Sequence, residues 1–296
     1  MTTRIDPIPL RQRLAARGLD GLTLLVLPAL VFVIAMFVYP FLYGLWLSFQ
    51  PKEGGALSNY IQFFSDSYLY GTIPTTLKLA LPATLVDLAL ALPIAFRVRL
   101  MRRQRVLTTL LVIPITLGTV LISQGLLNYL GPQGWVNRSL LGLGLISEPV
   151  KLLHNYWGVF IAMVLVGFPF TFLLTLSYLT GIDPALEHAA ATLGAGPWQR
   201  FRLVLLPLLV PGLAITFCLS FVQEFSVFPS AVLLGAPSGP TRVIAIAAYQ
   251  AAYESYDYSL ASAIAMIMGC VQLMIVAGVL TLRGLFYRGS VAAAKG

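Results

Sequence analysis

Six long apolar stretches, separated by short polar segments, run along the chain. They cover residues 22–49, 73–96, 106–130, 157–179, 205–234 and 260–282. A helix needs roughly 20 apolar residues to cross the hydrocarbon core of a bilayer, and each stretch is long enough. We therefore predict an all-α integral membrane protein: a domain of six transmembrane helices over 22–286, preceded by an N-terminal segment 1–21 and followed by a tail 287–296.

Lysine and arginine residues are distributed unevenly between the predicted loops. Fourteen lie at the two termini and in the segments 97–105 and 181–204, whereas four lie in the loops 50–72, 131–156 and 235–259. Because positively charged loops stay in the cytoplasm, we predict cytoplasmic termini and three external loops. The apolar stretch that begins at Leu22 is too long for a cleaved signal peptide, so we expect it to remain as the first span.

The composition agrees with a lipid environment. Of the 296 residues, 58% are hydrophobic and 10% are charged, whereas about a quarter of the residues of a soluble domain are charged. The net charge of +8 lies in short segments between apolar stretches, which indicates orientation signals and no nucleic-acid partner. Cys218 and Cys270 lie inside apolar stretches, and His154 and His188 stand alone, so we expect no disulfide framework and no metal site.

The most informative polar segment is the loop over residues 183–207. Asp183 is a good helix N-cap, Pro184 suits the first helical position, and an alanine-rich run follows. Gly194 suits the position that ends a helix. A second helical segment begins at Gly196 and Pro197 and continues towards the next span. The pattern predicts a helix, a glycine corner and a second helix on the cytoplasmic side.

Two functions are compatible with this loop. The small side chains of Ala189, Ala190 and Ala191 would let the helix backbone approach a partner surface closely. An alanine-rich connector between two spans would have the same composition. The spacing alone leaves both interpretations open.

A family resemblance favours the docking interpretation. The run His188-Ala189-Ala190, followed by Gly194 and by Leu206-Pro207, resembles the EAA loop of permease subunits of binding-protein-dependent ABC importers. That loop has the form Glu-Ala-Ala, three residues, Gly, and a Leu-Pro pair about a dozen residues later. Here His188 occupies the place of the usual glutamate and Glu187 precedes it, so either residue could make the glutamate's contact. Further matches to the family are Leu27-Pro28, Tyr39-Pro40, Leu47-Ser48-Phe49, Asn59-Tyr60, Phe63-Phe64, Thr76-Leu77 and Pro211-Gly212.

The resemblance is closest to the permeases for spermidine and putrescine, ferric iron and phosphonates, and it implies a type I importer fold and a set of partners. The loop would be a coupling helix that docks on an ATPase through Glu187, His188, Ala189, Ala190, Gly194 and Pro197. The sequence contains no Walker A pattern, so ATP and Mg would be bound by a separate ATPase dimer, and this chain would be no enzyme by itself. A second permease subunit, identical or homologous, and an external solute-binding protein would complete the importer in the bacterial cytoplasmic (inner) membrane.

Placing an ionisable side chain inside a transmembrane span costs free energy, and such residues usually face the bundle interior or a water-filled path. Glu224, flanked by Gln223 and Ser226, and Asp87 are therefore candidates for the translocation path of a small charged or zwitterionic solute such as a polyamine. A hydrogen bond between helices is the structural alternative for Glu224. Lys78 lies near the end of a span, where its side chain can reach the interface.

An ion-coupled secondary transporter or channel that uses Asp87 and Glu224 is the other function to weigh, and it would not need the 183–207 loop to dock on a partner. An intramembrane enzyme is disfavoured, because the sequence contains neither Gly-x-Ser-x-Gly nor His-Glu-x-x-His.

Overall fold

The computed structural model of this chain describes residues 21–286, and all regular structure among them is helical. Six helical rods are long and apolar enough to cross a membrane: Val26–Ser48, Ser67–Val98, Gln104–Gly142, Tyr156–Thr180, Pro197–Phe225 and Tyr258–Gly284. The predicted all-α class with six spans is confirmed. Apart from Gly21, the expected N-terminal segment 1–21 lies outside the described residues, as does the expected tail 287–296.

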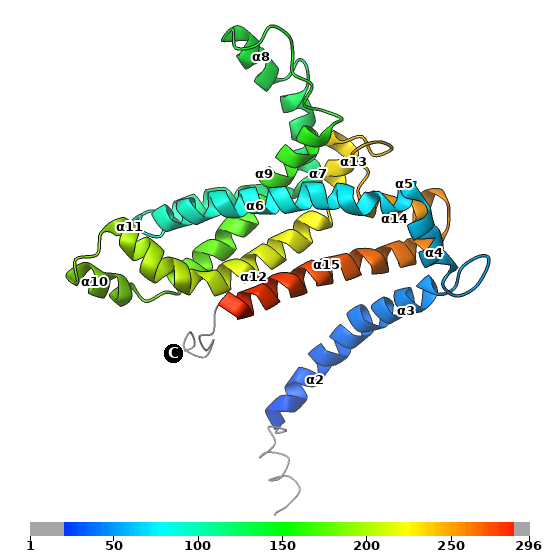
Figure 1. Cartoon of the computed structure of the whole chain (residues 1–296), viewed down its shortest axis with the longest axis horizontal. Coiled ribbons are helices and arrows are strands. Elements are labelled where there is room, and N and C mark those ends of the chain that lie inside the picture. Colours follow the sequence, from blue (N-terminus) through cyan, green and yellow to red (C-terminus); the bar gives the residue numbers. More distant parts are fainter. Residues whose placement is uncertain (1–20, 287–296) are drawn as a thin grey trace, which may run out of the picture.

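The first span consists of α2 (Gly21–Val33), the π-helix η1 (Ile34–Val38) and α3 (Tyr39–Ser48). The π-helix ends two residues before Pro40, whose ring cannot fit a regular α-helical interior. This rod leads away from the other helices and contacts them through α3, which packs against the last span (Figure 1). Two short helices, α4 (Ser58–Ser65) and α5 (Ser67–Tyr70), then lead to the second span.

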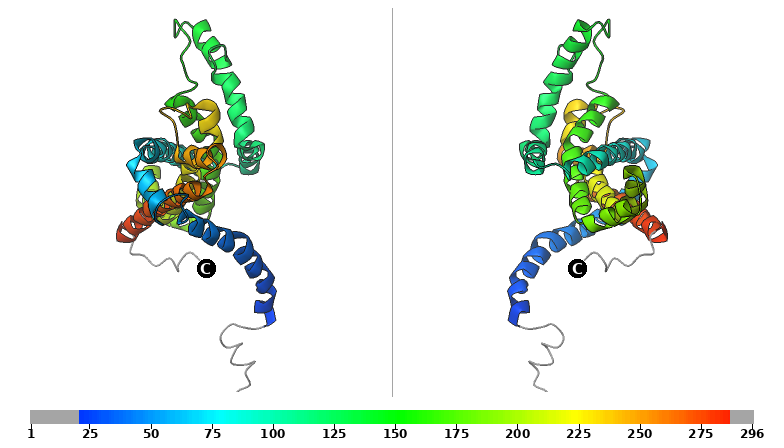
Figure 2. Two further views of the ribbon diagram at one scale, coloured as in Figure 1. Left: turned by 90° about the vertical axis from the view of Figure 1, so that its right-hand side faces the viewer. Right: turned by 90° about the vertical axis from the view of Figure 1, so that its left-hand side faces the viewer.

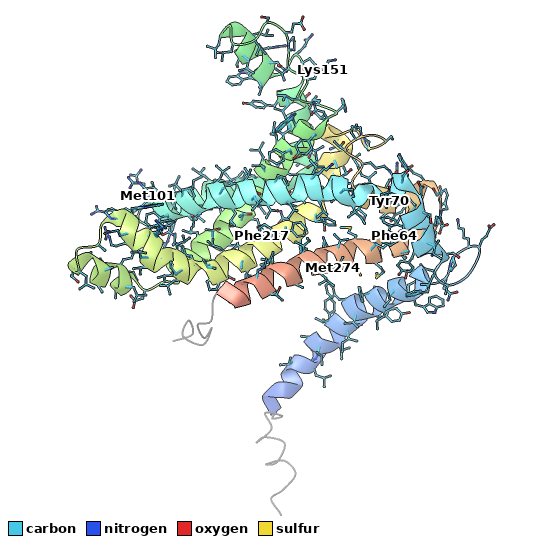
Figure 3. All side chains as sticks on the ribbon, viewed as in Figure 1. Phe64, Tyr70, Met101, Lys151, Phe217 and Met274 are labelled. Atoms are coloured by element: carbon cyan, nitrogen blue, oxygen red, sulfur yellow. The ribbon has the colours of Figure 1, made fainter. Side chains whose placement is uncertain are left out.

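Three helices form the centre of the bundle: α6 (Thr72–Val98), α9 (Tyr156–Thr180) and α12 (Leu206–Phe225). Each packs against the other two, and α15 (Tyr258–Phe286) packs against α12. Met101 follows α6 at the end where α10 and α11 lie, and Tyr70 precedes it at the opposite end (Figure 3). The charge bias predicts that the Met101 end is cytoplasmic.

The third span, α7 (Gln104–Leu130), packs against α9 and extends beyond the bundle. It has a kink at Gly118, where φ is 73°. The short helix α8 (Trp135–Gly142) follows at its far end and projects from the body of the molecule (Figure 2).

The fifth span begins and ends earlier in the chain than the sequence indicates. It begins with α11 (Pro197–Arg200) and η2 (Phe201–Leu205) and continues through α12, which ends at Phe225. The predicted limit at residue 234 is wrong, because residues 226–228 leave the helix and α13 (Pro229–Leu234) begins anew with proline in its first turn. The helix α13 packs against α7 and α9, and a 3.0 Å hydrogen bond joins the hydroxyls of Ser123 and Ser230.

The segment between the fifth and sixth spans contains two further helical pieces, α14 (Ile244–Tyr249) and the π-helix η3 (Gln250–Glu254). The helix α14 packs against α15 and α6. The predicted external loops therefore carry short helices.

Candidate functional site

The 183–207 loop begins with the predicted helix, α10 (Pro184–Thr192). The Asp183 side chain accepts a hydrogen bond of 2.8 Å from the backbone N–H of Ala185, and Pro184 occupies the first turn. This contact satisfies one of the backbone donors that a helix leaves without an intrahelical partner. The sequence therefore fixes the start of α10 locally.

The predicted stop at Gly194 is confirmed. Gly194 has a φ of +85°, a backbone conformation that strains any other residue. The N–H of Ala195 donates to the carbonyl of Ala190, and the N–H of Gly194 donates to that of Ala191, both at 3.0 Å. This pair of bonds is the usual closure of a helix that ends at a glycine.

The second helical segment starts where the sequence predicts. The backbone N–H of Gly196 donates to the Gln199 side chain at 2.9 Å, and α11 begins at Pro197. From there the chain continues through η2 into α12 without a break in helical structure. The corner at Gly194 therefore sets the direction of α10 relative to the fifth span.

An ion pair holds α10 against the end of α6. The Arg99 guanidinium donates to the carboxylate of Glu187, and it also lies 4.7 Å from the centre of the Phe96 ring. The side chains of Arg99 and Glu187 are 8% and 19% exposed. Glu187 is therefore engaged within the chain, whereas the next residue, His188, is exposed.

The rest of α10 and its corner form an outward surface. No residue of α10 is buried, and the helix stands clear of the main bundle (Figure 1). Among its apolar side chains, Leu193 is 88% exposed and Trp198 of α11 is 68% exposed. Ala189, Gly194 and Pro197 are exposed and Ala190 is half-buried, so this surface contains both small residues and large apolar ones.

A second candidate site lies between α6, α9 and α12. The carboxyl groups of Asp87 in α6 and Glu224 in α12 reach the same place beside Gly167 of α9, where an added Cβ would overlap both. Asp87 has no exposed surface and Glu224 is 4% exposed. Neither oxygen of Asp87 has a hydrogen-bond partner among the described residues.

The four path candidates divide into two pairs. Asp87 and Glu224 are buried together, whereas Gln223 and Ser226 are exposed. The Gln272 side chain of α15 donates to the Ser226 hydroxyl at 2.9 Å. Glu224 is in the last turn of α12, near one end of the fifth span, although it lies level with the middle of α6 and α9.

Sequence reasoning did not identify Gly167 as part of this site. A glycine within an apolar span is the signal that marks a close approach between helices. One turn along α9, the Thr171 hydroxyl lies 2.7 Å from that of Ser220 in α12, so polar contacts continue between these two helices.

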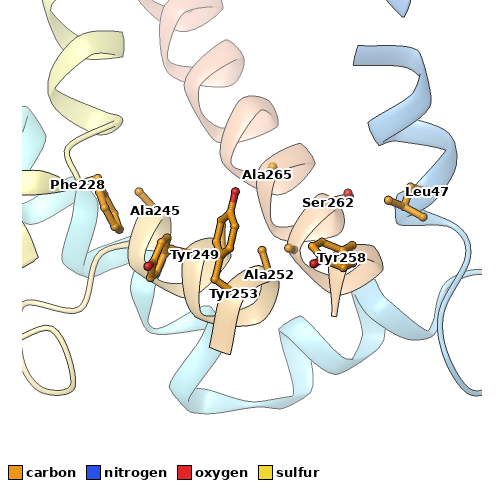
Figure 4. A pocket seen from close by; sticks show the side chains of 11 residues that line it. Leu47, Phe228, Ala245, Tyr249, Ala252, Tyr253, Tyr258, Ser262 and Ala265 are labelled. Atoms are coloured by element: carbon orange, nitrogen blue, oxygen red, sulfur yellow. The ribbon is translucent and has the colours of Figure 1, made fainter. Parts of the chain in front are cut away.

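An open groove of about 480 Å³ lies at the opposite end from α10, between α3, α14, η3 and α15 (Figure 4). Tyr249 stands between Phe228 and Tyr253, with ring centres 5.0 Å apart in each pair. Alanine side chains fill much of the remaining wall. The groove is therefore apolar and aromatic, and none of the predicted site residues lines it.

Comparisons with known proteins agree on one family. The family model described as "Binding-protein-dependent transport system inner membrane component" matches residues 83–283. The chain is 33% identical to a probable sulfate transport system permease protein of Prototheca wickerhamii, over 55% of this chain and 62% of that one. It is 29% identical to the spermidine/putrescine transport system permease protein PotB of Haemophilus influenzae, over 66% and 71%.

A solved structure shows the same fold. The bacterial alginate ABC transporter, in complex with a periplasmic protein bound to an alginate pentasaccharide, contains a chain that superposes with a TM-score of 0.78 at 22% identity. The superposition covers 95% of this chain and 99% of that one.

Proposed function

This chain belongs to the family of binding-protein-dependent transport system inner membrane components, and on that premise we propose that it docks on its ATPase through α10 and forms half of the path for a small polar solute. It is the permease subunit of an ABC importer, a multi-pass membrane protein. The observation that carries the docking proposal is the outward position of α10, a helix without buried residues that the Arg99–Glu187 pair and the Gly194 corner hold in place.

The exposed positions define how α10 would meet the ATPase. Because Glu187 is paired with Arg99, we expect His188 to meet the ATPase at the position of the usual glutamate of the EAA loop. Ala189 and Ala190 allow the close approach, and Gly194 and Pro197 set the corner that follows. Leu193 and Trp198 would supply the apolar area that the contact buries.

Because one chain forms only half of the solute path, the proposal includes further subunits of the importer. A second permease subunit, identical or homologous, supplies the other half, and two ATPase subunits bind ATP and Mg. An external solute-binding protein delivers the solute, as the periplasmic protein bound to the alginate transporter illustrates for that complex. The ATP-hydrolysing activity of the importer belongs to the ATPase chains.

The solute path is the second part of the proposal. Gln223 and Ser226 stand on the exposed side of the last turn of α12, with Glu224 and Asp87 behind them. Carboxyl groups near a path suit a cationic or zwitterionic solute, and PotB of Haemophilus influenzae is named for the polyamines spermidine and putrescine. Replacing Glu224 with Gln keeps the volume and removes the charge. If import keeps its rate and selectivity in the assembled complex, Glu224 exerts no electrostatic influence on the path.

The orientation proposed from the charge bias places the 97–105 and 181–204 loops in the cytoplasm. Single cysteines in each loop, in a background lacking Cys218 and Cys270, can be probed in intact cells with an impermeant thiol reagent. Labelling in the 235–259 loop and protection in the 181–204 loop are expected. The reverse pattern would overturn the orientation.

The docking proposal is tested at two positions of the loop. Gly194→Asp disturbs the corner, because a residue with a Cβ is less favourable than glycine in the left-handed conformation and the variant also adds a negative charge to the docking surface. Ala190→Glu places a large charge where close approach is needed. Both variants should insert normally but should lose ATPase subunits on purification or lose ATP hydrolysis stimulated by loaded binding protein.

A matched control separates docking from backbone strain. Gly144 also has a positive φ, 68°, with open space around it, and it lies in the 131–156 loop on the opposite side of the predicted membrane. Gly144→Asp should leave attachment and stimulated hydrolysis unchanged. If Gly194→Asp and Ala190→Glu behave like this control, α10 is not the docking element.

A further inference from the structure

Asp87 and Glu224 are two buried acids, and neither forms an ion pair with a lysine or arginine among the described residues. Asp87 is fully buried, and both of its oxygens lack a hydrogen-bond partner among the described residues. The Glu224 carboxyl group reaches the same place beside Gly167, and the glycine leaves room for both carboxyl groups because it has no side chain.

The helices that pack around the pair bring no positive charge to it. In α6, Lys78 and Arg97 are nine and ten residues from Asp87, which corresponds to about 14 Å along a helix. In α15, Arg283 is eleven residues beyond Gln272, the residue that contacts the last turn of α12. The remaining titratable groups on packed elements lie on other turns or at helix ends: Arg105 and Tyr129 of α7, Tyr156 and Tyr178 of α9, Cys218 of α12, Tyr249 of α14 and Tyr258 and Cys270 of α15.

Two neighbouring carboxylates cannot both remain charged under these conditions. Transfer of a single carboxylate from water into an apolar interior is already strongly unfavourable, and a second one adds repulsion at close range. One proton held between two adjacent carboxyl groups removes the repulsion and halves the buried charge, and the protonated acid donates a hydrogen bond that stabilises the remaining carboxylate.

We propose that Asp87 and Glu224 form a buried proton-binding site that holds one proton and links α6 to α12 across Gly167. The proton belongs to the pair rather than to either residue. It supplies the hydrogen-bond donor that the oxygens of Asp87 lack. It also connects two of the three helices at the centre of the bundle, one turn away from the Thr171–Ser220 contact.

A metal ion fits the site less well than a proton. Calcium takes six to eight oxygen ligands and magnesium takes six in octahedral geometry, so two carboxyl groups fall short. No cluster of three or more His, Cys, Asp or Glu side chains occurs among residues 21–286. The absence of exposed surface on Asp87 also closes the site to the solute in this conformation.

Infrared spectroscopy of the whole importer in lipid tests the proposal by counting protonated carboxyl groups at neutral pH. The carbonyl stretch of a protonated acid is distinct from carboxylate bands, and the difference spectrum between the wild type and Asp87→Asn/Glu224→Gln cancels the carboxyl groups of the other subunits. The expected result is the loss of one protonated carboxyl band per permease chain. No band would mean that both groups are ionised, and two bands would mean that each holds its own proton. Either result overturns the proposal.

Two further variants keep the test decisive if the double variant fails to assemble. Asp87→Asn alone leaves Glu224 beside a neutral amide, so its carbonyl band should shift from the wild-type position, and Glu224→Gln should shift the band of Asp87 correspondingly. An unshifted band in both single variants would show that the groups do not interact. Asp183→Asn is the control, because it removes an exposed carboxylate and should leave the protonated band unchanged. None of these readouts depends on ATPase docking or on solute import.

Discussion

Arg99, just beyond the C-terminal end of α6, pairs with Glu187 in the first turn of α10, 88 residues later in the chain. The chain joins the candidate docking helix α10 to the fifth span, and this ion pair connects α10 to a second central helix, α6. A carboxylate also suits the first turn of a helix, where the backbone N–H groups create a positive end. A change in the position of α6 would therefore be transmitted to α10.

Breaking this pair should loosen α10 without unfolding the bundle. Glu187→Gln leaves the partly buried Arg99 without its anionic partner, at a cost of about 1 to 3 kcal/mol. We expect weaker retention of the ATPase on purification and lower stimulated hydrolysis. The exchange variant Arg99→Glu/Glu187→Arg should restore part of both signals. Equal retention in the wild type and in Glu187→Gln would show that the pair does not position α10.

Gly167 should not tolerate a larger side chain. In Gly167→Ala the added methyl group would overlap the carboxyl groups of Asp87 and Glu224, and such overpacking typically costs about 1 to 3 kcal/mol. The matched control is Gly278→Ala in α15, where an added Cβ meets nothing within 4 Å. Alanine improves helix propensity there by up to about 1 kcal/mol. The thermal inactivation midpoint of the purified importer should fall for the first variant and stay or rise for the second.

The sequence predicts the spans and the shape of the loop because both depend on local patterns. The six apolar stretches and the Gly194 stop need no knowledge of distant contacts. The end of α12 at Phe225 was missed because apolar residues continue beyond it to residue 234, and hydropathy does not register which backbone groups form hydrogen bonds. Pro229 was the available signal for the new helix.

The candidate sites are less predictable because they depend on pairs of residues far apart in the chain. The acidic residues Asp87 and Glu224 stand out in the sequence, but nothing in it shows that they meet beside Gly167. The same holds for Glu187, because nothing in the sequence shows that it pairs with Arg99 while the neighbouring His188 is left exposed.

At the end of the bundle opposite α10, lysine should not be able to replace Arg242. Its guanidinium donates to the carbonyl of Tyr68 at 2.7 Å and to the Gln250 side chain at 2.9 Å, and it lies 3.8 Å from the centre of the Tyr68 ring. Burial lowers the pKa of Arg242, while Tyr68, Asp66 and Glu254 nearby oppose that shift, and an arginine stays protonated in either case.

The amine of a lysine cannot reproduce this planar set of contacts. Arg242→Lys should therefore lower the stability of the importer by about 1 to 3 kcal/mol, the cost of leaving buried partners unpaired. Arg138→Lys, at an exposed arginine in the 131–156 loop, is the control and should have no effect. Thermal inactivation of the two purified variants checks this prediction, and equal midpoints would contradict it.

Asp257 should stabilise the start of α15 in a pH-dependent way. Its carboxylate accepts hydrogen bonds of 2.9 Å from the backbone N–H of Leu260 and from the Ser259 hydroxyl, and it lies 3.6 Å from the ammonium group of Lys52. Burial raises the pKa of Asp257, but these hydrogen bonds and the Lys52 charge outweigh it and hold the pKa below its ordinary value. A carboxyl group with a lowered pKa in the folded protein contributes stability at pH values above its unfolded pKa, and that contribution disappears as the pH falls through the folded value.

The stability difference between the wild type and Asp257→Ala should therefore be constant near neutral pH and should shrink below about pH 4. The helix cap that Asp257 forms, and not its ion pair with Lys52, should account for most of this stability difference. A cap contributes typically about 1 kcal/mol. An exposed ion pair contributes roughly 0.2 to 1 kcal/mol, and the Lys52 side chain is 58% exposed. Lys52→Gln should consequently have a smaller effect than Asp257→Ala on thermal inactivation at neutral pH. The opposite order would show that the charge of Lys52, and not the bond to the Leu260 N–H, fixes the start of the last span.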